Sequence, residues 1–357
     1  METSFLPWVD KNSDKLDWDY LSKNIKEISI LEKHLYKLDW NTLSCNINAI
    51  PILEKDLRKV NWKDLSRNMN AIHILEENLD KINWWELSHN MNAISILENN
   101  LHKIDFDSLS SNVNAISILN DNLDKKVNWY YLSQNTNAVS ILENNLDKVD
   151  WYFLSRNENA IYILEENIDR IKWGHLSQNI NAISILEKNI DKIVWHCLCQ
   201  NINAISILEK NVSKIDWYDL SYNINAISIL EKNLDHVYWS NLSSNINAIS
   251  ILEKNLDKID WHRLSYNVNA ISILEKNQEK IHWKALSANP KAIHLLEQNQ
   301  DKIDWYYLSY NPNIFCFDYE YYKKRMDIHR EELMKKVFHP KRLAYYLEIG
   351  YDEDDEI

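Results

Sequence analysis

The sequence is dominated by a 22-residue unit that is repeated fourteen times between residues 18 and 313. An aromatic residue stands at position 1 of each unit, with Leu at position 4 and Asn at position 7. A single spacing is longer, at 23 residues, where an extra lysine appears at Lys125–Lys126. Because one such unit cannot bury its apolar side chains alone, the period predicts a solenoid of stacked units. The units begin at Trp18, Trp40, Trp62, Trp84, Phe106, Trp129, Trp151, Trp173, Trp195, Trp217, Trp239, Trp261, Trp283 and Trp305.

Each unit is predicted to form two short helices. Asp or Asn precedes the aromatic residue in ten units, and both are good N-caps for a first helix. The Asn at position 7 is followed by Pro290 and Pro312 in two units, which predicts that a second helix begins there. Asn at position 17 is predicted to end this helix in a left-handed conformation, since the chain has only two glycines.

A leucine-rich-repeat solenoid is the alternative, because its periods include units of this length. The run Ile246, Ile249 and Ile251 begins its pattern, but Lys254 stands where that pattern requires Asn. The expected Asn comes one residue late, at Asn255. We therefore predict an all-α fold: an α-solenoid of about fourteen two-helix repeats, curved into a rod with a cap at each end.

The segments on either side of the repeats are predicted to be caps. Residues 1–17 resemble a degenerate half-repeat, in which Trp8 covers the open end of the array. Residues 314–351 are predicted to form a helical cap, with an amphipathic helix over 319–338 and a second helix over 343–349, both apolar toward the last unit. Residues 352–357 are an acidic tail. The predicted segments are therefore 1–17, 18–313, 314–351 and 352–357.

Composition narrows the class of protein. The net charge of −13 disfavours nucleic acid as a partner, because a general phosphate-binding surface is basic. The four cysteines occupy no repeating position, which favours a reducing compartment over a disulfide framework. No apolar run approaches the length of a membrane span. We predict a cytoplasmic protein that does not enter a membrane.

The repeat unit resembles the short tandem repeats found in many proteins of giant DNA viruses. The resemblance rests on the aromatic residue, Leu-Ser, Asn and Asn-Ala-Ile of each unit, and on a tail that contains His339, Pro340 and Leu343. It covers nearly the whole chain. This family has no established activity to carry over. The resemblance implies a viral repeat protein that acts inside a host cell.

Positions 2, 3 and 6 change almost freely from unit to unit, whereas the framework positions, such as Leu at position 4 and Asn at position 7, hardly change. These positions share one helix face, and they are rich in Tyr, His and Trp, residue types that are common in interaction hot spots. The competing interpretation is that these positions simply face solvent and are free to vary. In that case, however, they should hold mostly Lys, Glu, Gln and Ser. The predicted partner-binding residues are Trp85, Tyr130, Tyr131, Tyr152, Arg156, Tyr218, Tyr222, Arg263, Tyr266, Tyr306, Tyr307 and Tyr310.

The favoured function is a non-enzymatic scaffold that binds a host or viral protein through this variable face. A reader of single-stranded nucleic acid is the alternative, because helical repeats can stack bases on aromatic side chains. Its basic residues would include Lys63, Arg67, Arg156 and Arg263, but acidic residues at the same positions weaken it. A structural component of a virion or viral factory is a third possibility.

The sequence predicts no enzyme, cofactor or metal site. Glu stands at position 15 in twelve of thirteen units, and such a row of identical acids makes no unique catalytic pair; we expect it to bind a neighbouring backbone or the Lys at position 20. His196, Cys197 and Cys199 form the only metal-like cluster. Cys199 merely replaces the usual Ser at position 5, and no second pair of ligands lies nearby.

Overall fold

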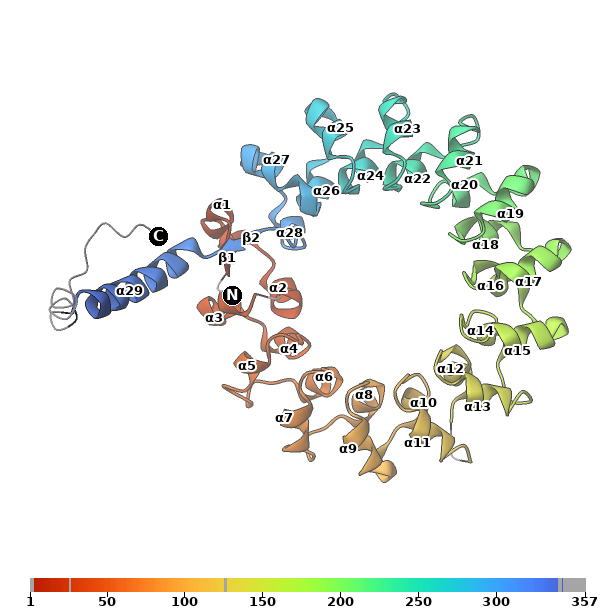
Figure 1. Ribbon diagram of the computed structural model, residues 1–357, viewed down its shortest axis with the longest axis horizontal. Helices are drawn as coiled ribbons and strands as arrows, with labels where there is room; N and C mark the ends of the chain where they lie inside the picture. The colour runs from red at the N-terminus through yellow and green to blue at the C-terminus, as the bar shows by residue number, and fades with distance from the viewer. Residues whose placement is uncertain (1–2, 26, 125–126, 340–341, 343–357) are drawn as a thin grey trace.

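The computed structural model describes residues 3–25, 27–124, 127–339 and residue 342. The fold is an all-α solenoid of short paired helices, as predicted. Its units follow one another around a closed ring, with the first helices on the inner side and the second helices on the outer side (Figure 1). The extra lysine, the predicted helix over 343–349 and the acidic tail lie outside the described residues.

The helices of the repeats are short and regular. The first helices are α2 (Trp18–Asn24), α4 (Trp40–Ser44), α6 (Trp62–Arg67), α8 (Trp84–His89), α10 (Phe106–Leu109), α12 (Trp129–Gln134), α14 (Trp151–Leu154), α16 (Trp173–Gln178), α18 (Trp195–Gln200), α20 (Trp217–Leu220), α22 (Trp239–Ser244), α24 (Trp261–Tyr266), α26 (Trp283–Ser287) and α28 (Trp305–Leu308). The second helices are α3 (Ile28–Lys33), α5 (Ile50–Leu53), α7 (Ile72–Glu76), α9 (Ile94–Glu98), α11 (Ile116–Asn120), α13 (Val139–Glu143), α15 (Ile161–Glu166), α17 (Ile183–Lys188), α19 (Ile205–Lys210), α21 (Ile227–Glu231), α23 (Ile249–Glu253), α25 (Ile271–Lys276) and α27 (Ile293–Gln298).

The remaining elements lie mainly at the two ends of the repeats. They are the strands β1 (Thr3–Phe5) and β2 (Phe315–Phe317) and the helices α1 (Pro7–Asp10) and α29 (Tyr319–Val337). Nine 3-10 turns are assigned among the described residues: Ser13–Lys15, Leu35–Lys37, Leu101–Lys103, Ile168–Arg170, Ile190–Lys192, Val212–Lys214, Gln278–Lys280, Pro290–Ala292 and Gln300–Lys302. No repeat unit contains a strand in the described part of the chain, which excludes the leucine-rich-repeat alternative.

The N-caps of the first helices are as predicted. All ten Asp and Asn residues before the aromatic position accept a backbone N–H of the following turn; Asp150, for example, accepts from Tyr152 N (2.9 Å) and Phe153 N (3.3 Å). Lys172, Val194 and Tyr238 provide no such bond at the same place. Their helices form nevertheless, because packing between units supplies most of the stability of helices this short.

Asn289 at position 7 begins a helical turn, Pro290–Ala292, directly before α27, as predicted, but the Asn residues at position 7 of other units and those at position 17 act differently. Asn201 at position 7 caps a turn rather than helix α19: its Oδ1 accepts from Asn203 N (2.9 Å), and α19 begins only at Ile205. Asn189 at position 17 has φ −132°, which is not left-handed. It ends α17 through its side chain, because its Nδ2 donates to Ile185 O (2.8 Å), the carbonyl four residues earlier.

One continuous apolar core runs through the whole ring. Leu at positions 4 and 14 and Ala at position 10 are fully buried in nearly every unit, as in Leu220, Leu230 and Ala226. The aromatic residue at position 1 is mostly half-buried against this core. In ten units a lysine at position 20 places its Nζ 4.6–5.2 Å from the ring centre of that tryptophan, a cation–π contact that covers the exposed side of the indole.

The fourteenth unit is assembled from both ends of the chain. Its first helix is α28, and its second helix is α1, whose Val9 is fully buried. Lys15 Nζ lies 5.0 Å from the Trp305 ring, and Asp17 N donates to Ser309 Oγ (2.8 Å). Both contacts repeat ones made within ordinary units, such as Lys37 on Trp18 and Asp39 N to Ser22 Oγ. We call residues 5–17 together with 305–314 the composite unit.

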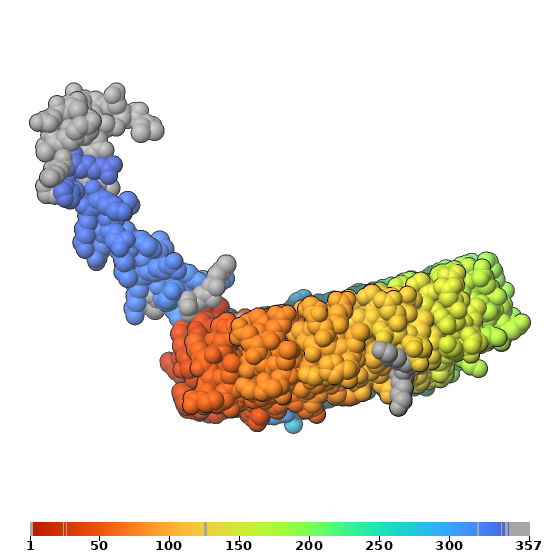
Figure 2. Space-filling view, turned by 90° about the horizontal axis from the view of Figure 1, so that it is seen from below, coloured from red at the N-terminus to blue at the C-terminus, as the bar shows by residue number. Residues whose placement is uncertain are grey.

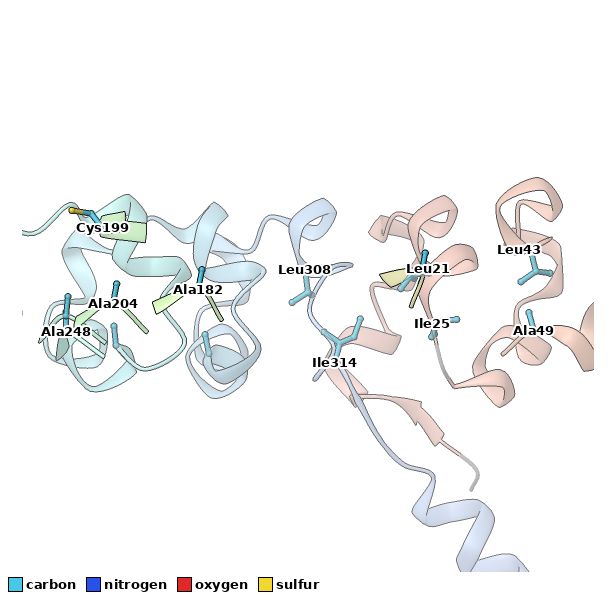
Figure 3. Packing of buried hydrophobic residues seen from close by; sticks show 14 of the residues in the cluster. Leu21, Ile25, Leu43, Ala49, Ala182, Cys199, Ala204, Ala248, Leu308 and Ile314 are labelled. Atoms are coloured by element: carbon cyan, nitrogen blue, oxygen red, sulfur yellow. The ribbon is translucent and has the colours of Figure 1, made fainter. Parts of the chain in front are cut away.

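A two-stranded sheet seals the composite unit. Strands β1 and β2 pair antiparallel, with Thr3 opposite Phe317 and Phe5 opposite Phe315, and Leu6 N donates to Ile314 O (2.9 Å). Figure 3 shows the buried Leu308 and Ile314 of the last unit beside Leu21 and Ile25 of the first. The array is therefore closed. The prediction of an open rod with Trp8 over a free end was wrong, because Trp8 packs near Trp305 of the other end (ring centres 6.2 Å apart).

The closure can be tested with a disulfide. Ser4 lies directly opposite Cys316, with Ser4 Oγ 3.5 Å from Cys316 Sγ. Ser4→Cys is expected to form a disulfide with Cys316 under mild oxidation, detected by intact mass as the loss of two hydrogens and by peptide mapping. Ser4→Cys/Cys316→Ser is the control that lacks the partner thiol. Failure of the single variant to cross-link within the monomer would contradict the closed ring.

Helix α29 does not cap the repeats. It projects away from the flat ring (Figure 2), and Tyr319, Met326 and Leu333 on it are 75%, 71% and 61% exposed. The predicted packing of its apolar side on the last unit is therefore not observed. The physical reason is that a closed ring has no open end to cover. In the described residues, no helix combines the length and apolar character needed to cross a membrane.

Candidate functional site: the inner wall of the ring

The variable positions line the inside of the ring. In each first helix the Leu at position 4 and the Ser at position 5 are buried, as in Leu220 and Ser221. Since the second helices lie on the outer side of the first helices (Figure 1), the face of each first helix opposite its buried Leu and Ser turns toward the ring centre. That face carries positions 2, 3 and 6. We call the side chains at these three positions of the fourteen first helices the inner wall.

The frame that holds the inner wall is a ladder of hydrogen bonds. Asn201 Nδ2 donates to Ser177 O (3.1 Å) and to Asn179 O (3.0 Å) of the preceding unit, and the same pair of bonds recurs from Asn68 to Asn311. Asn203 Nδ2 at position 9 donates to Ile180 O (3.0 Å). Asn at positions 7 and 9 therefore links each unit to the one before it. They fix the first helices at a constant spacing while positions 2, 3 and 6 vary.

The twelve predicted partner-binding residues all lie on this wall. Nine aromatic residues among them are 37–52% exposed: Trp85, Tyr130, Tyr131, Tyr152, Tyr218, Tyr222, Tyr266, Tyr306 and Tyr310. Arg156 is also exposed, whereas Arg263 and Tyr307 are half-buried. The structure does not gather the twelve into one place. It divides them into two aromatic sectors and the isolated Trp85, which contacts His89 (ring centres 5.0 Å apart).

The first sector spans α12, α14 and α16. Tyr130 contacts Tyr131 and Phe153, with ring centres 5.1 and 3.9 Å apart, and Tyr152 contacts Phe153 and His175 at 4.8 and 3.8 Å. The rings thus form one chain of contacts across three units. Burial lowers the pKa of His175, and the nearby Arg156 charge adds to the effect. The lowered pKa favours the neutral imidazole, whose ring meets the Tyr152 ring edge-on, at an interplanar angle of 60°.

The second sector runs from α20 through α28 to α2, across the junction of the two chain ends. We define the tyrosine sector as Tyr218, Tyr222, Tyr266, Tyr306, Tyr307, Tyr310 and Tyr20. Tyr20 and Tyr310 are in close contact, with ring centres 3.8 Å apart. The Tyr310 hydroxyl donates to the Tyr306 oxygen (3.0 Å), and this bond together with burial raises the pKa of Tyr310 to about 12. That phenol stays protonated at any physiological pH.

Two cations lie within the tyrosine sector. Arg263 donates to the Tyr222 hydroxyl and its guanidinium carbon lies 5.8 Å from the centre of the same ring. Lys284 Nζ lies 4.7 Å from the centre of the Tyr307 ring. Contact with aromatic faces orients both cations while leaving part of each accessible. Arg263 also lies 3.8 Å from Asp260 Oδ2, whose other oxygen caps α24.

The inner wall differs in charge from the rest of the protein. It carries six basic side chains, Lys23, Lys63, Arg67, Arg156, Arg263 and Lys284, and five acidic ones, Asp19, Asp64, Glu86, Asp107 and Asp219. The whole chain has a net charge of −13, so the negative excess lies elsewhere. One acid is buried: Glu86 is 5% exposed and lies 3.8 Å from Lys63 Nζ and 3.7 Å from Arg67 Nη1.

Several residues of these sectors were absent from the sequence-based prediction. Phe153, His175 and Lys284 occupy the same variable positions and could have been included on that ground. Tyr20 also occupies position 3, but its contact with Tyr310 could not be predicted, because the two are 290 residues apart in the chain and only ring closure brings them together. Tyr238 precedes α22 at position 22, which is not one of the variable positions 2, 3 and 6. Its ring centre lies 5.3 Å from that of Tyr218.

On the outer face, the Glu carboxylates that recur at position 15 make contacts between units. Glu at position 15 accepts from the side chain at position 12 of the next unit, as in Tyr162 Oη to Glu143 (2.8 Å) and His73 Nε2 with Glu54 (2.6 Å). In other units it pairs with the next Lys at position 16, as in Lys55 with Glu32 (2.6 Å). In these units the Glu carboxylate therefore binds a side chain of the next unit rather than a neighbouring backbone group or the Lys at position 20, as had been expected.

The His and Cys side chains of α18 do not converge on one point. His196 Nε2 and Cys197 Sγ are 3.3 Å apart, but Cys199 is fully buried, and burial raises its thiol pKa to about 12. Within the described ranges, no group of three or more His, Cys, Asp or Glu residues could hold a metal ion. Comparison of the chain with protein-family models, curated proteins and solved structures gives no match.

Proposed function

We propose that this protein is a non-enzymatic scaffold that binds another protein, of host or viral origin, through the inner wall. The observation that carries the proposal is the contrast between a constant frame and a variable, aromatic-rich face that stays exposed. Burying Tyr and Trp gives a large apolar contact area with little loss of side-chain entropy. A closed ring presents that face all around one central axis, so it can contact a partner from several sides.

A reader of single-stranded nucleic acid fits the same aromatic residues less well. Such readers combine stacking aromatics with a positively charged track along the backbone. Here five carboxylates interrupt the inner wall, and the net charge of the chain is −13. Long-range repulsion would therefore oppose a polyanion at low salt.

The proposal is tested by removing the first aromatic sector. Tyr130→Ala/Tyr131→Ala/Tyr152→Ala is expected to weaken binding of the main partner, recovered by affinity purification from host cells and then purified, by about a hundredfold or more. The dissociation constant is measured by biolayer interferometry. Because these side chains contact other aromatics as well as solvent, circular dichroism must show the same helical content in both proteins.

A matched control removes tyrosines from the outer side. Tyr36, 80% exposed, and Tyr162, 43% exposed, lie at positions 19 and 12 of their units. Tyr36→Ala/Tyr162→Ala is expected to bind the partner like the wild type. If the inner and outer variants bind equally well, the inner wall is not the interaction surface.

A further inference from the structure

The first unit departs from the repeat at position 10. Its residue there is Glu27, which is half-buried, whereas the fourteenth unit has the fully buried Ile314. The other twelve units have a fully buried alanine: Ala49, Ala71, Ala93, Ala115, Ala138, Ala160, Ala182, Ala204, Ala226, Ala248, Ala270 and Ala292. A carboxylate therefore replaces a methyl group in the one unit that follows the junction of the two chain ends.

Glu27 lines a pocket at this junction, which we call the junction pocket. The pocket has a volume of about 130 Å³, well below the roughly 300–1,000 Å³ of sites for drug-sized ligands. Of the described residues that line it, Glu27 alone carries a charge. Most of the other lining side chains are aromatic or apolar: Tyr20, Leu21, Ile25, Tyr310, Pro312 and Phe315. Because these residues come from both ends of the chain, the pocket exists only in the closed ring, and its size suits one side chain.

The lining of the junction pocket suits a cation. An ammonium group is attracted to the faces of aromatic rings, and it forms charge-assisted hydrogen bonds with a carboxylate, whose two oxygens can accept several bonds at once. A second carboxylate is near. The hydrogen bond with Tyr306 and burial raise the pKa of Tyr310 to about 12, and the negative charge of Asp17 adds to this rise. The pocket thus combines aromatic rings with the negative potential of Glu27 and Asp17.

The lysines of the two helices beside the pocket, α2 and α3, are directed elsewhere. Burial raises the pKa of the Cys45 thiol and the Lys23 charge opposes this rise, which places Lys23 toward the second unit. Lys33 Nζ, at the end of α3, donates to Asp318 Oδ2 (2.8 Å). Lys26, between the two helices, lies outside the described residues.

Ammonium groups contact aromatic rings throughout this protein. The lysine at position 20 lies 4.6–5.2 Å from the centre of a tryptophan ring in ten units. Lys284 Nζ makes the same kind of contact with Tyr307, at 4.7 Å, in the tyrosine sector. Tyr20 and Tyr310 belong both to the inner wall and to the junction pocket. A lysine of a partner on the inner wall can therefore reach the pocket past these two rings.

From these features we infer that the junction pocket binds a lysine side chain of the partner protein. The alkyl part of that lysine packs against Leu21 and Ile25, and its ammonium group pairs with Glu27. Lysine suits a pocket of this size better than arginine, because its charged head is compact whereas a guanidinium group is a wide planar fork. The inference rests on the proposed function and adds the chemistry of one anchoring contact.

The test measures the binding of short probes to the full-length protein by titration in saturation-transfer difference NMR, which detects weak ligands. The first probe is a capped glycine–lysine–glycine peptide. In the second probe norleucine replaces lysine, which keeps the four-carbon side chain and removes the ammonium group. The lysine peptide is expected to bind about tenfold more tightly or better, because only its ammonium group can pair with the carboxylate. The third probe, n-butylamine, represents a free amine and is expected to bind no more tightly than the lysine peptide.

Variants of the full-length protein assign the binding to Glu27. Glu27→Ala restores the residue that twelve other units have at this position, and Glu27→Gln keeps the shape of the side chain without its charge. Both are expected to weaken binding of the lysine peptide by about tenfold or more. Glu98→Gln removes the same charge from an exposed side chain of α9 and is expected to leave the affinity unchanged. Lys26→Asn, which restores the common residue of position 9, is also expected to bind like the wild type.

Each other outcome overturns the inference. No binding of the lysine peptide, or equal binding of the norleucine peptide, shows that the junction pocket does not select an ammonium group. Equal loss in Glu27→Gln and Glu98→Gln shows that net charge rather than the pocket attracts the peptide. Tighter binding of n-butylamine assigns the pocket to free amines, and tighter binding by Lys26→Asn shows that a lysine of the chain itself competes for it. In all of these cases the proposed function is judged separately, by whether the Tyr130/Tyr131/Tyr152 variant of the first aromatic sector loses its protein partner.

Discussion

Asn201→Ala is expected to lower the free energy of unfolding by about 3 kcal/mol or more, because each buried polar group left without a partner costs about 1–3 kcal/mol. Asn201 is 1% exposed and makes three hydrogen bonds. Its amide nitrogen serves two carbonyls of the preceding unit, and its oxygen accepts from Asn203 N. Alanine leaves Ser177 O and Asn203 N without these partners, and it removes one of the two donors to Asn179 O, which still accepts from Ala182 N (3.2 Å).

Asn203→Ala is the matched control, two residues away. Asn203 is exposed and its side chain makes one bond, to Ile180 O. Water can replace that bond, so we expect a loss of about 1 kcal/mol or less. Urea denaturation followed by circular dichroism measures both variants. Equal losses would show that the buried ladder at position 7 is no more important than the exposed one at position 9.

The helical character of the fold could be predicted because it depends on local chemistry. Ten Asp and Asn residues before the aromatic position cap ten helices through their own side chains, and this bond needs no distant partner. The burial of Leu at position 4 and Ala at position 10 follows equally from the strict repetition of these residues. The roles of Asn189 and Asn201 could not be predicted in the same way. An Asn that begins a helix and an Asn that links two units look alike in a sequence.

Ring closure could not be predicted from the sequence, for a geometrical reason. Fourteen units close only if each turns the chain by one fourteenth of a circle, and this small rotation depends on packing between units rather than on any residue pattern. Residues 9–12 do match the second half of a unit, with Val9 in place of the Leu at position 14 and Asn12 as the Asn at position 17. A half-unit at one end of the chain can either cap the array or complete the unit at the other end. In this structure it completes the fourteenth unit.

The inner wall was predictable as a set of positions but not as a site. The variation at positions 2, 3 and 6 identified one face of each first helix, and all twelve residues chosen from it line the ring. Which of them touch depends on the neighbouring units. Tyr20 joins Tyr310 because residues 290 apart become neighbours at the junction. The pocket beside them has the same origin.

Val9→Asp is expected to open the ring without unfolding the repeats. Val9 is fully buried in the composite unit, where an isolated carboxylate costs several kcal/mol. The cost falls on the one unit that is not continuous in the chain, so detachment of α1 and β1 relieves it. Because each unit contacts only its neighbours, the other thirteen keep their packing. Small-angle X-ray scattering should therefore show a larger radius of gyration with nearly unchanged circular dichroism.

Val212→Asp is the control for this change, because Val212 is 38% exposed in a turn on the outer face. A surface change of this kind costs about 0.5 kcal/mol or less, and the ring should stay closed. An unchanged radius of gyration in both variants would mean that the composite unit does not hold the ring together. Opening by Val9→Asp alone, with loss of the pocket at the junction, would make closure itself a condition for the tyrosine sector to form. In that case the ends of the chain, rather than any single repeat, determine whether the protein can bind its partner.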